Sequence, residues 1–129
     1  MRLFVGLEIS PGVVNAASGL MEILRERAAR FAPRSRITWV AAERLHVTVR
    51  FIGQIDDGRA AGVVDALRDA IGVHRFEVEV AGAGVFPPKG PPRVIWAGLS
   101  SGRDHLAAVE QAVSDRLAAA GVERERRPF

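Results

Sequence analysis

The chain has 129 residues, of which 48% are hydrophobic and 26% are charged, a composition typical of an ordinary globular protein. It contains no cysteine, which excludes thiol catalysis, thiolate metal sites and disulfides from these residues and fits a reducing cytoplasm. The net charge of +3 and the pI near 10.8 allow a polyanionic ligand but are too weak to indicate nucleic acid by themselves. We expect one domain over residues 1–129, or two small lobes that share a core, with no signal peptide and no membrane span.

The first half of the chain predicts, in order, a strand, a long helix, a short strand and a longer strand. Apolar residues alternate over Arg2–Ile9, which is typical of a strand. Ser10-Pro11 is a helix start, and apolar residues at helical spacing carry this helix to about Arg30. We then expect a short strand at Ile37–Ala41 and a longer one that Gly53 ends.

The second half predicts two more helices and two more strands. The expected features, in chain order, are a helix that starts at Asp56 and Asp57 and ends at Gly72, a half-exposed strand over Phe76–Val80, a loop over Gly82–Pro92, a buried strand over Val94–Leu99, and a helix through Leu106, Val109, Val113 and Leu117 that Gly121 stops. The closely spaced strand pairs favour antiparallel sheet and therefore an α+β fold.

The most informative segment is Leu45–Gly53. Its odd positions are apolar up to Phe51, and its even positions begin with His46, Thr48 and Arg50. Because a strand sends alternate side chains to opposite faces, this pattern puts an imidazole, a hydroxyl and a guanidinium on one face, roughly 6.5–7 Å apart in succession. Such groups could serve one phosphate as proton-transfer group, hydroxyl donor and cation. The ordinary alternatives are a half-exposed histidine without a role, a threonine that merely favours a strand, and a solvated arginine.

Several segments, in the right order, resemble the 2′-5′ RNA ligase family, also described as RNA 2′,3′-cyclic phosphodiesterases, in the two-histidine phosphoesterase superfamily. Trp39-Val40 followed by Leu45–Gly53 resembles the first His-x-Thr-x motif of that family. The other matching segments are Met1–Leu7 for the opening strand, Gly84–Pro87 with Pro92–Gly98 for the central loop and strand, and Arg127–Phe129 for the approach to the second motif. His-x-Thr-x alone is a weak motif, whereas the ordered set is specific.

The resemblance implies a two-lobed α+β fold, with antiparallel sheets lining a groove and helices on the outside. It implies an enzyme that hydrolyses RNA 2′,3′-cyclic phosphate ends, for example on tRNA fragments, to 2′-phosphates, and that in reverse joins RNA ends through 2′-5′ linkages. His46 and Thr48 would be catalytic, and neither a metal nor a cofactor is needed, because in-line displacement at phosphorus requires one base and one acid. The threonines would donate hydrogen bonds to non-bridging oxygens.

The family carries a second His-x-Thr-x motif, which this sequence does not contain. His74 is followed by Arg75 and Phe76, and His105 by Leu106 and Ala107, so we expect both histidines to be surface residues. One imidazole cannot serve both apical positions of the reaction in a single step. We therefore expect this chain to lack the C-terminal strands of the fold and to be inactive or nearly so.

The Gly- and Pro-rich segment offers further substrate-binding candidates. Phe86 could stack on an RNA base, or it could anchor the loop on the core. Arg93, with Lys89, could line an RNA groove or be solvated. We expect Trp39 and Trp96 to lie in the core or in a groove wall.

Two other interpretations of the sequence remain open. One is a non-catalytic single-strand RNA-binding module that keeps the groove without the chemistry. The other is a truncated product whose fold is completed by pairing with a second copy through an exposed sheet edge, although monomers are expected for the intact family.

Overall fold

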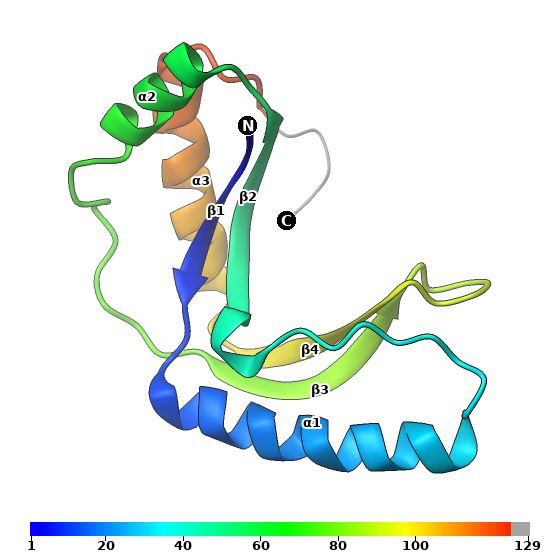
Figure 1. Ribbon diagram of the computed structural model, residues 1–129. Helices are drawn as coiled ribbons and strands as arrows, with labels where there is room; N and C mark the ends of the chain where they lie inside the picture. The colour runs from blue at the N-terminus through cyan, green and yellow to red at the C-terminus, as the bar shows by residue number, and fades with distance from the viewer. Residues whose placement is uncertain (125–129) are drawn as a thin grey trace. The chain divides into compact units, whose positions relative to one another are not determined.

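The computed structural model describes residues 1–124, so the predicted match at Arg127–Phe129 lies outside the described residues (Figure 1). The elements follow in the order β1 (Arg2–Glu8), α1 (Pro11–Phe31), the 3-10 turn η1 (Ala42–Arg44), β2 (His46–Gln54), α2 (Asp57–Ala66), β3 (Glu79–Phe86), β4 (Val94–Ser101) and α3 (Arg103–Ala119). β1 pairs with β2, and β3 pairs with β4, in two two-stranded sheets. Helices combined with an antiparallel sheet confirm the predicted α+β class.

Contacts along the chain divide the molecule into two compact units, which we describe separately. The N-terminal unit is Gly6–Thr48, and the main unit combines Met1–Val5 with Val49–Phe129. The N-terminal unit contains α1 and η1, whereas the main unit contains α2, α3 and the β3–β4 hairpin. The single domain expected over residues 1–129 stays a prediction.

In the N-terminal unit, α1 begins as predicted, with extended backbone at Ser10 and Pro11 in the first helical position. The strand expected at Ile37–Ala41 is wrong, because these residues form a coil that leads into η1. Their apolar side chains are not enough, since a strand also needs a partner for its backbone hydrogen bonds. No helix in the described part of the chain is long and apolar enough to cross a membrane.

In the main unit, α3 supplies the centre of the core. Val109, Val113 and Leu117 recur at helical spacing on one face, and Leu117 is completely buried. They pack with Val49 of β2 and Val63 of α2. Full burial stabilises each such side chain by about 1.5–3 kcal/mol, so this cluster holds β2 against α3. The apolar stripe predicted for the third helix is confirmed.

α2 starts where its acidic residues predict. The Asp56 carboxylate accepts a hydrogen bond from the backbone N–H of Arg59 at 2.9 Å, which lowers the pKa of that carboxyl. The helix ends at Ala66, so the C-cap predicted at Gly72 is wrong. Apolar residues beyond Ala66 are partly buried against the core without a helical backbone, which shows that tertiary packing replaces the helical period there.

β3 and β4 form an antiparallel hairpin in which Gly84 faces Trp96 and Phe86 faces Val94. The strand predicted over Phe76–Val80 has both ends wrong. β3 starts at Glu79 and ends at Phe86, so it extends into the loop predicted over Gly82–Pro92. The backbones of β3 and β4 approach so closely that some positions leave no room for a side chain. A Cβ on Gly98, for example, would lie 2.7 Å from the carbonyl oxygen of Ala81. The strand predicted from Val94 is confirmed, but its first three residues are exposed rather than buried.

Candidate active site

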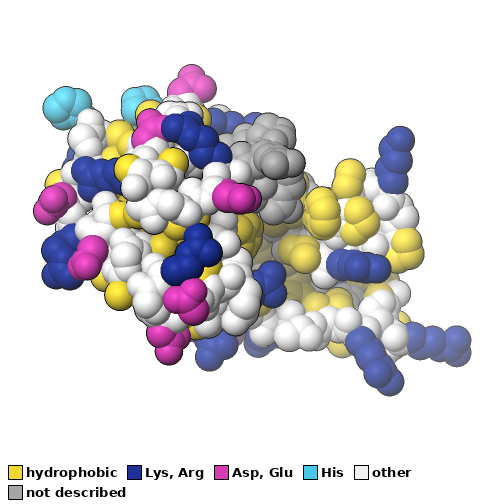
Figure 2. All heavy atoms as spheres, turned by 90° about the horizontal axis from the view of Figure 1, so that it is seen from above, with side chains coloured by type: hydrophobic (Ala, Val, Ile, Leu, Met, Phe, Trp, Pro, Cys, Tyr) yellow, Lys and Arg dark blue, Asp and Glu magenta, His cyan; other side chains and the backbone are white. Residues whose placement is uncertain are grey.

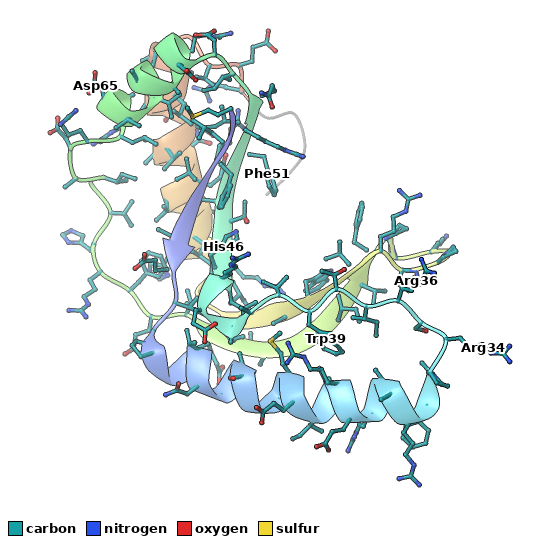
Figure 3. All side chains as sticks on the ribbon, in the orientation of Figure 1. Arg34, Arg36, Trp39, His46, Phe51 and Asp65 are labelled. Atoms are coloured by element: carbon teal, nitrogen blue, oxygen red, sulfur yellow. The ribbon has the colours of Figure 1, made fainter. Side chains whose placement is uncertain are left out.

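His46 opens β2 directly after η1, and its side chain is exposed (Figure 3). The turn is closed by the backbone N–H groups of Arg44 and Leu45, which donate to the carbonyls of Ala41 and Ala42. It leaves the Arg44 carbonyl oxygen 2.9 Å from Nδ1 of the imidazole. A carbonyl oxygen can only accept, so Nδ1 carries a proton in this contact and the lone pair of the neutral ring is on Nε2.

This hydrogen bond assigns roles to the two ring nitrogens. Nδ1 orients the ring against its own backbone, so any proton transfer by the neutral ring would use Nε2. In the neutral ring Nε2 can take a proton as a general base, and in the imidazolium it can return one as a general acid. The residue is exposed at the start of a strand.

Thr48 lies two residues further along β2 and is half-buried. Strand geometry keeps it on the same face as His46, at a separation of roughly 6.5–7 Å between the two Cα atoms. Both residues belong to the N-terminal unit. Their catalytic roles stay predictions.

Arg50 has structural partners in the main unit. Only 4% of this residue is exposed. Its guanidinium donates to the carbonyl oxygen of Glu123 and lies 3.9 Å from Oε1 of Glu110. Among the described residues its Nε has no acceptor. Arg50 therefore ties β2 to α3 and to the chain that follows α3. Its predicted role in binding substrate stays a prediction.

The side chains of β2 do not alternate between two faces over the whole strand. Val49 and Arg50 are both buried, whereas Phe51, which we placed on the apolar face, is 56% exposed. The Phe51 ring instead pairs with Phe4, with centroids 6.4 Å apart and a tilt of 47°. The predicted division into a polar and an apolar face therefore fails from Arg50 onward.

The structure brings Phe86 and Arg93 together at the end of the hairpin. The backbone N–H of Arg93 donates to the carbonyl oxygen of Phe86 at 2.8 Å. Phe86 is 62% exposed, so it is not an anchor packed on the core, and Arg93 and Lys89 are exposed as well. These residues belong to the main unit, whereas His46 and Thr48 belong to the N-terminal unit. Their roles in binding substrate stay predictions.

The two tryptophans have different surroundings. Trp39 is half-buried in the N-terminal unit, where the guanidinium carbon of Arg25 lies 5.5 Å from its ring centroid. Trp96 is 48% exposed and lies across Gly84, so the expected core position is wrong for it. The facing of Gly84 and Trp96 depends on strand register, which composition and periodicity do not reveal.

The other histidines are exposed, as predicted. His105 stacks on Phe76, with ring centroids 5.0 Å apart. Across residues 1–124, the side chains of His, Asp and Glu form no group of three or more that could hold a metal ion.

His46 and Thr48 thus lie two residues apart on one strand of an α+β scaffold. The family model described as "LigT like Phosphoesterase" matches residues 14–96, which include His46, Thr48 and the β3–β4 turn. The chain belongs to this LigT-like phosphoesterase family.

Curated relatives carry a more specific name. The RNA 2′,3′-cyclic phosphodiesterases of Aeropyrum pernix and Thermotoga maritima are 34% and 30% identical to this chain over 90 and 118 residues. These alignments cover 70% and 91% of this chain, but 51% and 59% of the relatives. The chain thus spans little more than half the length of the curated relatives it matches.

Solved structures agree on the fold. A protein of Thermus thermophilus has a TM-score of 0.74 at 22% identity, with 100% of this chain and 69% of that chain covered. LigT of E. coli, solved in complex with 3′-AMP, has a TM-score of 0.64 at 23% identity, with 99% and 67% covered. At these identities the likeness supports the fold of this chain.

Proposed function

We propose that this chain supplies His46 and Thr48 to the hydrolysis of RNA 2′,3′-cyclic phosphate ends. The observation that carries the proposal is the hydrogen bond from Nδ1 of His46 to the Arg44 carbonyl oxygen, on the strand that carries Thr48 two residues further along. The names of the curated relatives support the same reaction. The absence of cysteine fits a reducing compartment, and we propose a cytoplasmic location.

The reaction is an in-line displacement at phosphorus. Water attacks the cyclic phosphate, the bond from phosphorus to O3′ breaks, and the phosphate stays on O2′. A base takes the proton of the water, and an acid on the opposite side protonates O3′ as it leaves. Nε2 of His46 can perform either proton transfer. With an RNA 5′-hydroxyl in place of water, the same bond breaks and a 2′-5′ linkage forms.

Thr48 adds a hydrogen-bond donor at the phosphate. During the displacement, negative charge builds on the non-bridging oxygens, and a hydroxyl held on the strand beside His46 can donate to one of them. A donor that is already in place stabilises this charge without reorganisation.

The 129 residues contain one His-x-Thr motif. Loss of one acid–base group typically lowers a rate by about 10²–10⁴-fold. We therefore propose that these residues by themselves hydrolyse a cyclic phosphate at least about 100-fold more slowly than a relative with two such motifs.

The test follows hydrolysis of an oligonucleotide with a 2′,3′-cyclic phosphate end by the parent chain, by His46→Ala and by His74→Ala. His74 is exposed like His46 and serves as the matched control. We expect slow turnover by the parent and by His74→Ala, and none above background by His46→Ala. Equal turnover by His46→Ala and the parent would remove His46 from the mechanism. Turnover by the parent at the rate of the Thermotoga maritima relative would overturn the proposed impairment.

If the parent chain shows no turnover, the test measures its affinity for oligonucleotides instead. An oligonucleotide with a 2′-phosphate end should bind more tightly than the same oligonucleotide with a 3′-hydroxyl, and His46→Ala should remove the difference.

A second candidate is a non-catalytic RNA-binding module. The exposed aromatic and basic side chains of the β3–β4 hairpin favour it. In that case RNA would bind without preference for a phosphate end, and His46→Ala would change nothing.

A further inference from the structure

The β3–β4 hairpin carries an unusual aromatic arrangement. Gly84 of β3 faces Trp96 of β4, and directly facing residues of an antiparallel pair have side chains on the same side of the sheet. A Cβ built on Gly84 would lie 2.1 Å from Cζ2 of Trp96. The indole therefore occupies the space where a side chain would stand, so one side of its ring rests on the β3 backbone.

The outer side of this ring is accessible, because Trp96 is 48% exposed. Two residues nearer the turn, Phe86 faces Val94 on the same side of the sheet, and these two residues are 62% and 52% exposed. Phe86 and Trp96 are thus diagonal neighbours, whose Cα atoms are typically about 7–8 Å apart. The result is a flat apolar surface with two aromatic rings, which we call the aromatic face and define as Trp96, Phe86 and Val94.

The charged residues near the turn of the hairpin are basic, whereas the acidic residue Glu79 lies at the far end of β3. From Val80 to Arg103 the sequence contains Lys89, Arg93 and Arg103 and no acidic residue. Arg103 donates to the Leu99 carbonyl at the far end of β4, whereas Lys89 and Arg93 lie in and beside the turn. Figure 2 shows basic and hydrophobic side chains interspersed on the surface of the molecule.

The combination of exposed aromatic rings and nearby basic side chains favours one kind of ligand over another. A neighbouring protein surface needs apolar area, but it does not need a run of cations free of acidic residues. A single-stranded nucleic acid needs both, because its bases stack on aromatic rings and its phosphates pair with lysine and arginine. Stacking also explains the glycine, since only a bare backbone lets the indole lie flat on β3.

We propose that Trp96, seated on Gly84, is a stacking platform for a base of single-stranded RNA, with Phe86 beside it and Arg93 and Lys89 at the phosphates. The inference rests on the proposed function in taking RNA as the ligand. It concerns nucleotides bound at the hairpin and does not involve the chemistry at His46.

The experiment measures binding of a short oligoadenylate with a 3′-hydroxyl end, so that no terminal phosphate contributes. In a Trp39→Phe background Trp96 is the only indole, because the chain has two tryptophans. We expect saturable quenching of its fluorescence as RNA is added. Trp96→Leu should weaken binding by about 5- to 100-fold, measured by anisotropy of labelled RNA, and Trp96→Phe should recover part of the loss.

Two further variants separate stacking from a general effect of the hairpin. Gly84→Ala keeps the indole but forces it off the backbone, and it should weaken binding in the same direction as Trp96→Leu. Ile95→Ala is the matched control, because Ile95 neighbours Trp96, is 64% exposed and points to the opposite side of the sheet. It should leave affinity unchanged.

The proposal is overturned if Trp96→Leu binds the oligoadenylate as tightly as the parent, or if RNA leaves the fluorescence unchanged. It is also overturned if acrylamide cannot quench Trp96 before RNA is added, since protein would then cover the ring. Turnover by His46 variants is measured separately, so a failure of the proposed function and a failure of this platform give different results.

Discussion

The two halves of β2 differ although they share one strand. Its first residues, His46 to Thr48, are exposed or half-buried and offer an imidazole and a hydroxyl. Its middle residues, Val49 and Arg50, are buried against α3 and its C-terminal end. Polar residues at neighbouring positions of one strand can therefore have different surroundings, since His46 is exposed and Arg50 is buried.

The largest expected effect is on stability, at Arg50. Arg50→Ala removes a buried guanidinium and leaves the Glu123 carbonyl and the Glu110 carboxylate without it. Loss of one partner from a buried charged network typically costs several kcal/mol, and we expect about 2–4 kcal/mol here. Urea unfolding followed by circular dichroism measures the change.

Arg68→Ala is the control for that change. The ion pair of Arg68 with Asp65 is exposed on both sides, with 71% and 68% of the side chains accessible. Its loss should cost no more than about 0.5 kcal/mol. An Arg50→Ala chain with the parent's urea midpoint and a large loss of RNA affinity would show that Arg50 faces the ligand and that the two halves of β2 act together.

A smaller effect is expected from Thr48→Val, which removes the hydroxyl but keeps the shape of the side chain. If Thr48 donates to a phosphate oxygen, affinity for 2′-AMP should fall about tenfold, because a hydrogen bond to a charged group contributes roughly 1.5–3 kcal/mol. Titration calorimetry measures this affinity. The melting temperature should stay within about 2 °C of the parent, since Thr48 is only half-buried and both side chains are branched at Cβ.

Thr38→Val provides the comparison for Thr48, because Thr38 is an exposed residue of the coil before η1. It should leave both affinity and melting temperature unchanged. Equal affinities for 2′-AMP in the parent and in Thr48→Val would leave Thr48 as an ordinary strand residue.

Much of the fold could be predicted because local signals and packing agree. Ser10-Pro11 starts α1 and Asp56 caps α2, and the helical spacing of Val109, Val113 and Leu117 marks the buried face of α3. The errors lie where tertiary contacts decide. Ile37–Ala41 has strand-forming residues but forms a coil, and glycines that indicate a loop instead allow close strand approach in β3.

The candidate site shows the same division. The alternation of residues predicted that His46 and Thr48 share a face, because the strand period alone determines it. It could not predict that Arg50 is buried, since this depends on Glu110 and Glu123, far away in the sequence. Nor could it predict that Trp96 lies on Gly84, which depends on the register of two strands.

The central claim is that His46 is held through Nδ1 and acts through Nε2. Nitrogen-15 NMR of the imidazole side chains, with the ring neutral, tests it directly. We predict a protonated Nδ1 and an unprotonated Nε2 for His46, and a shift of Nε2 on addition of 2′-AMP that His74 and His105 do not share. The opposite tautomer, or a His46 spectrum that 2′-AMP leaves unchanged, would contradict the account.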